Sequence, residues 1–205
     1  MEIAQGFAQS NPLKQLFRGK TLLPKRYLWI IDQNDCVLRF TAVDRHMLAN
    51  LSPDIIAYNR LMANSFKHFT GLSILEMAYA ADLDDTALAK ALFNAPQAIV
   101  SHGAEADPIF RYANAQALAL WAMDWETFTR LPSRLSAETA DDIQSDRNAL
   151  LKSALARGWV DDYAGVRISS SGQRFHIQNT TLWNVVDSQG VHHGQAAFIR
   201  DWRFL

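Results

Sequence analysis

The spacing of apolar residues predicts two helices before the centre of the chain. In residues 52–71 apolar side chains recur at helical spacing, at Ile55, Met62, Phe66 and Phe69. Ser52, Pro53 and Asp54 supply a capping hydroxyl, a first-turn proline and a first-turn acid, and Gly71 ends the run. A second helix is predicted over 84–93, with Pro96 just beyond its end. We expect residues 50–94 to form a helical cap that precedes a sheet domain over 95–205.

The first half of the sheet domain is predicted to contain two strands and several helices. Residues 97–102 and 109–114 are predicted strands, 115–121 a short helix, and Asp124 caps a further short turn. Residues 139–142 have the spacing of a capping box, with Asp142 in place of the usual glutamate. This box opens the longest predicted helix, which ends at Gly158. Its apolar stripe consists of Ile143, Leu150, Leu151, Ala154 and Leu155.

From residue 162 the apolar period changes to two, which is typical of strands. Val166 and Ile168 share a face of the first predicted strand, and 194–202 form the last one. The strand over 175–185 places one set of residues on a single face: Phe175, Ile177, Asn179, Thr181, Trp183 and Val185. Its other face, with His176, Gln178, Thr180 and Leu182, is predicted to point outward. Such alternation predicts an antiparallel sheet that helices cover on one face.

Residues 1–49 follow neither period and are predicted to be an N-terminal extension of uncertain structure. The segments YLWII and CVLRF could form a hairpin around the turn residues Gln33 and Asn34. The alternative is a mobile arm, or an upstream extension with Met47 as the true start.

Composition is that of an ordinary globular protein and limits the classes of partner. Hydrophobic residues make up 49% and charged residues 20%, and the net charge is −1. We therefore expect neither nucleic acid nor a membrane as partner, and no run approaches the roughly 20 apolar residues of a membrane span. No secretory signal is visible, so a cytoplasmic location is expected. The single cysteine, Cys36, excludes an internal disulfide and a multi-cysteine metal site.

The sheet domain resembles a known family in the order of its short motifs. The segment HGAEADPIFRYANAQALALWAMDWETFTRLPSRLSAE resembles the strand-turn-strand-helix opening of PAS domains. The words SHG, YAN, LALW, DWETF, LPSRL, DYAGVRISSSG and GQAA resemble the narrower MEKHLA family of PAS-related domains, over roughly residues 50 to 202. That family occurs as small stand-alone bacterial proteins, the type expected here, and at the C-terminus of plant homeodomain–leucine-zipper factors. In the plant proteins the region is associated with dimerisation and with light or redox sensing.

The resemblance implies an α+β fold: a PAS-like five-stranded antiparallel sheet with flanking short helices and a helical N-terminal cap. The sheet would enclose either a small molecule or only side chains. Light-sensing LOV domains, a PAS branch, carry a reactive cysteine in a word that corresponds here to Pro132 to Leu135. Ser133 stands at that position, and a serine hydroxyl lacks the thiolate chemistry of cysteine. A LOV photocycle is therefore not expected, and the identity of any cofactor stays open.

Eight residues are candidate ligand-binding residues of this pocket. They are Asn114, Trp121, Trp125, Ser133, Arg134, Arg167, Asn179 and Trp183. Each has a structural alternative: Asn114 could cap the following helix, and the tryptophans could be core. The two arginines could bind an anion bidentately or lie on the surface. Arg167 is near the sequence position at which flavin-binding relatives carry an amide side chain. Asn179, if buried, needs a partner in a neighbouring strand, a water or a ligand.

Catalytic and metal motifs are missing from the sequence, so we expect no enzyme and no metal site. No H-E-x-x-H, G-x-G-x-x-G or G-x-S-x-G word occurs. His192 and His193 are adjacent on a strand and point to opposite faces. A small isomerase or hydratase that uses His102 with Asp107 or Asp162 is a third, weaker alternative.

The sequence thus predicts a sensory or regulatory module that binds a small molecule and signals through a protein partner or self-association. The alternative is an interaction or homodimerisation domain with a filled core.

Overall fold

The computed structural model describes residues 51–75, 82–137, 152 and 156–205. The hairpin predicted around residue 33, Met47, and nearly all of the helix predicted to begin at 139 lie outside these residues. So does Cys36.

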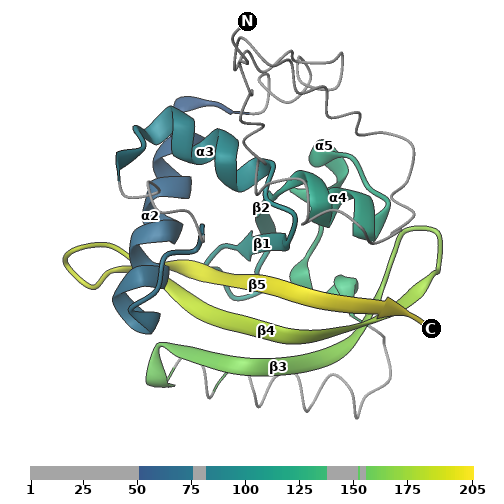
Figure 1. The fold of residues 1–205 in the computed structure, drawn as a ribbon. Helices are drawn as coiled ribbons and strands as arrows, with labels where there is room; N and C mark the ends of the chain where they lie inside the picture. Colours follow the sequence, from purple (N-terminus) through teal and green to yellow (C-terminus); the bar gives the residue numbers. More distant parts are fainter. Residues whose placement is uncertain (1–50, 76–81, 138–151, 153–155) are drawn as a thin grey trace, which may run out of the picture. The chain divides into compact units, whose positions relative to one another are not determined.

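The centre of the fold is an antiparallel sheet of five strands in the order β2-β1-β5-β4-β3 (Figure 1). The strands are β1 (Ala98–His102), β2 (Phe110–Ala113), β3 (Trp159–Ile168), β4 (Arg174–Val186) and β5 (His192–Phe204). Each neighbouring pair runs antiparallel. The predicted α+β, PAS-like class, a five-stranded antiparallel sheet with flanking short helices, is confirmed.

β3 begins at Trp159 rather than at the predicted residue 162. Its pairing with β4 shifts register on both sides of Tyr163, and Asp162 has a left-handed backbone with φ 57°. A bulge of this kind interrupts the period of two that alternation relies on. The alternating pattern therefore did not predict the first residues of this strand.

The two predicted helices before the sheet are formed as α2 (Pro53–Thr70) and α3 (Asp85–Phe93). The Ser52 hydroxyl accepts a hydrogen bond from the Ile55 N–H at 3.4 Å, and Gly71 ends α2 in a left-handed conformation. Within the described residues no helix has the length and apolar character needed to cross a membrane.

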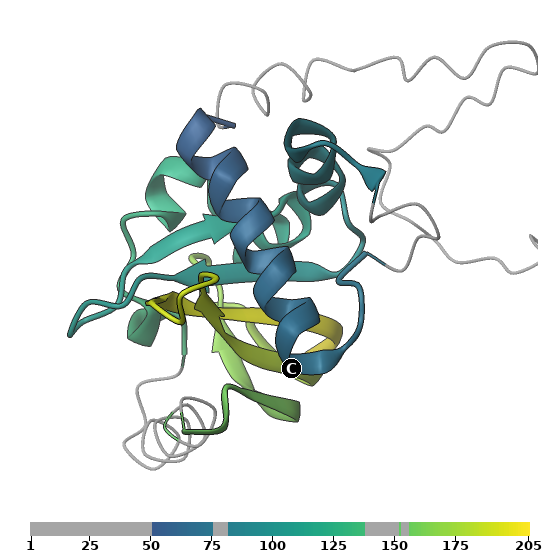
Figure 2. The ribbon, with the colours of Figure 1, turned by 90° about the vertical axis from the view of Figure 1, so that its left-hand side faces the viewer.

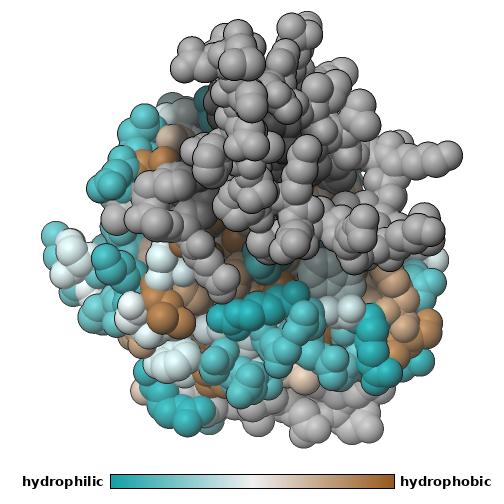
Figure 3. Space-filling view, in the orientation of Figure 1, coloured by the Kyte–Doolittle hydropathy of each residue, from teal (hydrophilic) through white to brown (hydrophobic). Residues whose placement is uncertain are grey.

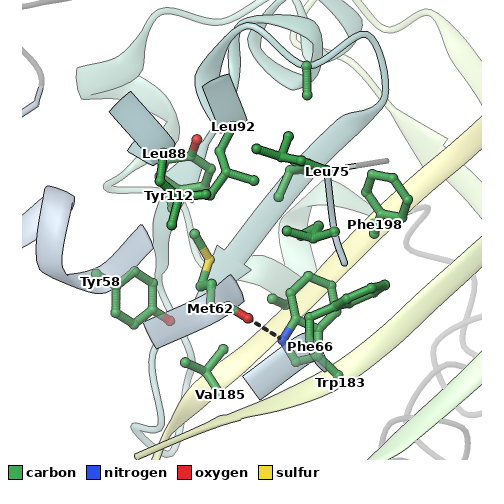
Figure 4. Close-up of a cluster of buried hydrophobic side chains, with 14 residues drawn as sticks. Tyr58, Met62, Phe66, Leu75, Leu88, Leu92, Tyr112, Trp183, Val185 and Phe198 are labelled. Atoms are coloured by element: carbon green, nitrogen blue, oxygen red, sulfur yellow. Dashed lines mark hydrogen bonds between the residues drawn. The ribbon is translucent and has the colours of Figure 1, made fainter. Parts of the chain in front are cut away.

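Side chains of α2 and α3 form one hydrophobic core cluster with one face of the sheet (Figure 4). Met62 and Phe66 are buried as predicted, and Phe66 contacts the ring of Trp183 edge-on with centroids 5.0 Å apart. Ile55 and Phe69 are only partly buried at the border of this cluster. Figure 2 shows α2 lying across the sheet, in front of the strands.

A second cluster lies on the opposite face of the sheet. In β1, Ile99 belongs to the first cluster and its neighbours Ala98 and Val100 to the second. Successive residues of a strand point to opposite faces, so the sheet forms the middle layer between two cores. The second core also takes residues from α4 (Ala115–Trp121) and α5 (Trp125–Phe128). The 3-10 helix η3 (Ser133–Ser136) follows α5 in the chain.

The surface of the described residues over β4 and β5 is largely hydrophilic on the side shown in Figure 3. Large exposed apolar side chains include Leu72, Val191 and the adjacent Phe204 and Leu205. Exposed apolar residues in small number are normal on a protein surface.

Candidate ligand cavity

A small cavity of about 50 Å³ lies against the second core. Residues of all five strands, Trp121 at the end of α4 and Ser136 of η3 form its wall. Most of that wall is apolar, with Phe110, Ile177, Leu182 and Ile199 among its residues. Two of the eight predicted residues, Trp121 and Arg167, line this cavity.

Arg167 is the buried charged residue of the cavity wall, with 7% of its surface exposed. Its Nη1 donates to the Val166 carbonyl at 2.9 Å, and its Nη2 donates to the Tyr163 hydroxyl at 2.9 Å. Within the part of the chain that the structure describes, no carboxylate lies within ion-pair distance of this guanidinium. Burying a charge without a counter-charge is costly, so the position of Arg167 calls for an explanation.

Gly165 leaves the space that the Arg167 side chain occupies. A Cβ atom at this position would stand 3.0 Å from Nη1 of Arg167 and 3.0 Å from the Tyr163 hydroxyl. Those distances are shorter than ordinary van der Waals contact, so a larger residue would require the guanidinium or the phenol to shift by a few tenths of an ångström.

Trp121 presents a buried donor at the cavity. The residue is 1% exposed, and its indole Nε1–H has no hydrogen-bond partner among the described residues. Its ring is held edge-on between Phe128 and Phe175, at centroid distances of 5.7 and 5.1 Å. A buried polar group left unpaired costs about 1–3 kcal/mol.

Asn114 does not line the cavity. It lies at the junction of β2 and α4, where both polar groups of its side chain form hydrogen bonds to the backbone. Its carbonyl oxygen accepts from the backbone N–H groups of Ile99 and Ala117, at 2.9 and 3.0 Å. Its Nδ2 donates to the backbone carbonyls of Leu92, Ala95 and Gln97. The residue is therefore an N-cap that also fastens the end of α3 to the sheet.

Trp183 and Trp125 lie in or against the first core and not at the cavity. The Trp183 indole donates to the Met62 carbonyl of α2 at 3.2 Å (Figure 4). Trp125 is partly buried, with its ring edge-on to Tyr112 at 5.8 Å. Both act as apolar surface, the structural alternative for these residues.

Ser133 and Arg134 also lie away from the cavity wall. Ser133 is buried in η3, where its N–H donates to the Pro108 carbonyl at 2.7 Å. Arg134 is exposed and pairs with Asp107 through its Nε, 3.0 Å from the carboxylate oxygen. That ion pair holds η3 to the loop before β2.

The prediction that Asn179 shares a face with Ile177 and Trp183 is wrong. Asn179 is exposed, adopts a left-handed backbone with φ 46°, and its amide donates to the Asp201 carboxylate. The alternation of β4 changes phase at this residue. Ile177 and Leu182 therefore belong to the second core, whereas Trp183 belongs to the first.

The same phase change corrects the predicted outward face of β4. Thr180 and Leu182 are buried, and Leu182 lines the cavity. Asparagine tolerates a left-handed backbone better than most residues, and this tolerance is the one local signal that could have indicated the change.

Sequence reasoning missed Tyr163 and Ser101, which connect the cavity to its surroundings. Tyr163 lines the cavity beside the bulge that interrupts β3. The Ser101 hydroxyl donates to the Gln195 carbonyl at 2.7 Å, so the Tyr58 hydroxyl donates to Ser101, also at 2.7 Å. Burial raises the pKa of Tyr58, more than this bond lowers it. A residue of α2 is thus bonded to a residue of the cavity wall.

The acid-base pairs of the enzymatic alternative are not formed inside the cavity. His102 is at its wall, but Asp107 and Asp162 are both exposed. Asp107 is engaged with Arg134 instead. Among the described residues no group of three or more His, Cys, Asp or Glu side chains could hold a metal ion.

The five-stranded antiparallel sheet with its flanking helices is a PAS-like fold. The model of the MEKHLA domain matches residues 56–204, which are most of the chain and include most of α2 and all of α3. The chain therefore belongs to the MEKHLA domain family.

A curated relative is the homeobox-leucine zipper protein ATHB-9 of Arabidopsis thaliana. It is 28% identical over 159 residues, which cover 75% of this chain. The match covers 18% of the plant protein, so the chain corresponds to a small part of that relative's length.

Solved structures with a similar fold are distant in sequence. The PAS domain of a Colwellia psychrerythraea protein is 14% identical with a TM-score of 0.46, over 55% of this chain and 92% of that one. An RNA-binding light-oxygen-voltage receptor is 20% identical with a TM-score of 0.49, over 63% and 35%. A variant of Vivid is 19% identical with a TM-score of 0.43, over 51% and 81%.

Proposed function

We propose that this chain is a sensory or regulatory module that binds a small molecule in the cavity beside Trp121 and Arg167. The observation that carries the proposal is the wall of that cavity. The wall is mostly apolar and contains a buried guanidinium without a counter-charge among the described residues, and a buried tryptophan whose indole N–H lacks an acceptor there. Without a bound molecule, the buried charge and the unpaired N–H would only destabilise the fold. The proposal includes no catalytic role for the chain.

The size of the cavity restricts the ligand. Pockets for drug-sized ligands and large cofactors measure about 300–1,000 Å³, and this cavity measures about 50 Å³. A flavin does not fit it, and Ser133 does not line it. The proposed ligand is consequently a molecule of a few heavy atoms.

The signal of ligand binding would pass from the cavity to α2. Ser101 borders the cavity and is hydrogen-bonded to Tyr58 of α2, the helix that covers the other face of the sheet. A ligand biases only conformations that it binds differently, and displacement of this bond is one such difference. We propose that the signal leaves through α2 to a protein partner or a second copy of the chain.

Several finer expectations from the sequence belong to the same proposal. They are a cytoplasmic location and the absence of a nucleic-acid or membrane partner. The division into 1–49, 50–94 and 95–205 is likewise proposed. The other six candidate residues lie outside the cavity wall and are not part of the proposed site: Asn114, Trp125, Ser133, Arg134, Asn179 and Trp183.

The second candidate function is an interaction domain with a filled core. It is favoured by the small volume of the cavity, which corresponds to about three to five water molecules. Water could satisfy Arg167 and Trp121 without any signal being sensed.

Native mass spectrometry of the protein purified from its host, followed by the same sample denatured, tests the proposal. A constant small mass lost on denaturation would show a retained ligand and support the sensory module. A native mass equal to a bare multiple of the chain mass would exclude a tightly retained ligand. Together with a titration that detects no weakly bound small ligand, it would make the filled-core domain the leading function. The same spectrum counts subunits.

A further inference from the structure

We infer that the cavity is a site for a small planar oxyanion, of the carboxylate or nitrate type, bound by Arg167 and Trp121. The inference rests on the proposed function and names the chemical class of its ligand.

The charge of Arg167 requires a negative partner. A guanidinium has five N–H donors, and the hydrogen bonds to Val166 and Tyr163 use one each on Nη1 and Nη2. The two acceptors are a carbonyl and a phenol, which are neutral. Because no described carboxylate pairs with this buried cation, an anion in the cavity is the group that would neutralise it.

Trp121 restricts the ligand further. An indole N–H is only a donor, as a guanidinium is, so two donors that line one cavity select a ligand rich in acceptors. Planar oxyanions match the flat fork of a guanidinium with two parallel hydrogen bonds. A third oxygen or a short substituent would then lie toward the indole and the apolar wall of Phe110 and Ile177.

The volume selects among oxyanions. A cavity of about 50 Å³ has room for about three to five heavy atoms, at about 10–15 Å³ for each water-sized position. Formate, nitrate and acetate satisfy this limit. Nucleotides, sugar phosphates and dicarboxylic acids of metabolic size exceed it.

The affinity expected for so small a ligand is modest. Binding of ligands of this size is limited to about 1.5 kcal/mol per heavy atom, so the dissociation constant cannot fall below roughly 0.5 mM for three heavy atoms or roughly 3 µM for five. We expect a value between roughly 10 µM and 10 mM. A ligand this weak is lost during purification, so it must be sought by titration.

The test is a titration of the full chain with 15N-labelled tryptophan, followed through the indole N–H resonances. Sodium formate, nitrate and acetate are added separately to dialysed protein while sodium chloride holds the ionic strength constant. The Trp121 resonance, assigned with a W121F variant, is expected to move saturably, whereas the Trp183 resonance stays in place because its indole already bonds Met62.

Variants separate the site from a general salt effect. R167Q removes the charge and is expected to weaken binding about tenfold or more. R134Q, at an exposed arginine away from the cavity wall, is the matched control and is expected to bind as the native chain does. If R167Q fails to fold, R167K keeps the charge without the planar fork and is expected to weaken binding as well.

Each result either supports or overturns the inference. Saturable binding that depends on Arg167 supports it, with or without a retained mass in the native spectrum. No saturable shift up to about 100 mM, ten times the weakest expected constant, overturns it, as does binding that R167Q and R167K leave unchanged. If the inference is overturned in this way, a retained neutral or cationic ligand in the native spectrum would still support the proposed function. A bare native mass would instead favour a filled core that holds water, and would contradict both the inference and the proposed function.

Discussion

Asn114 shows how one residue can fasten three elements. Its side chain caps α4, accepts from the Ile99 N–H of β1 and donates to carbonyls that follow α3. The residue is completely buried, so its backbone partners cannot form hydrogen bonds to water instead when the side chain is removed. A buried group that loses its partner costs more than an exposed one.

We therefore expect Asn114→Ala to lower the free energy of unfolding by about 3 kcal/mol, the sum of a lost cap and at least one unpaired buried group. Urea denaturation followed by tryptophan fluorescence measures the change. Asp124→Ala is the control, because Asp124 caps α5 in the same way but is exposed. Equal losses in the two variants would contradict the multiple role of Asn114.

At the scale of elements, the pairing of β1 with β5 depends on the absence of a side chain at Gly194. This residue has φ 142°, and a Cβ atom there would stand 2.0 Å from the backbone carbonyl oxygen of His102. Backbone of a paired strand cannot move aside as a flexible side chain can. The start of β5 can therefore lie beside β1 only with glycine at this position.

Gly194→Ala is expected to destabilise the fold by about 3 kcal/mol, near the upper limit for overpacking. Gly190→Ala is the matched control: it too has a left-handed backbone, φ 81°, but no atom within 4 Å of the new Cβ. Only the backbone cost of about 1–2 kcal/mol applies there. Thermal or urea unfolding of the pair measures the difference, and the reverse ranking would refute the steric explanation.

The turn between β4 and β5 contains an ionisable group that makes stability depend on pH. His193 Nε2 lies 2.9 Å from the Asp187 carboxylate, and the N–H groups of Val191 and Gln189 donate to the same side chain. These bonds, that of His193 first, lower the pKa of Asp187 from its usual range.

A carboxyl with a lowered folded-state pKa stabilises the fold above its unfolded pKa of about 4, and this stabilisation is lost as pH falls through the folded pKa. We expect the native chain to be more stable than Asp187→Asn at neutral pH, with a difference that shrinks as the pH falls below about 4. Denaturant midpoints measured across this range check it. A difference independent of pH would show that the ionised carboxylate is not the stabilising group.

At the scale of the whole molecule, the sheet is shared between two cores. Phe66 of α2 contacts both Trp183 of β4 and Phe198 of β5. The Ser65 hydroxyl accepts from the Val186 N–H at 2.9 Å, which joins α2 to the end of β4. The helix is therefore part of the cooperative structure of the domain.

Phe66→Ala is expected to lower the free energy of unfolding by about 3–5 kcal/mol, the usual cost of emptying an aromatic site in a core. Leu72→Ala, at an exposed leucine just beyond α2, is the control and is expected to change it by less than about 0.5 kcal/mol. Circular dichroism and tryptophan fluorescence should report one common transition. Separate transitions would mean that α2 unfolds independently of the sheet.

The sequence by itself determined α2, α3, β1, β2, α4 and α5, and most of β4 and β5. Ser52, Asn114 and Asp124 cap helices through bonds to residues three positions away, and such local signals survive without tertiary context. The motif words that identify the family are short and contiguous, so they too are visible in the chain alone.

Only the tertiary structure decided which residues meet at the cavity. Alternation fixes a side chain's face only while the backbone stays regular, and the left-handed residues Asp162 and Asn179 change the phase of β3 and β4. Arg167 and Tyr163 meet Trp121 because strands far apart in the chain pair in one sheet and α4 packs on it. Whether a space is left between them depends on packing to fractions of an ångström, which no sequence period encodes.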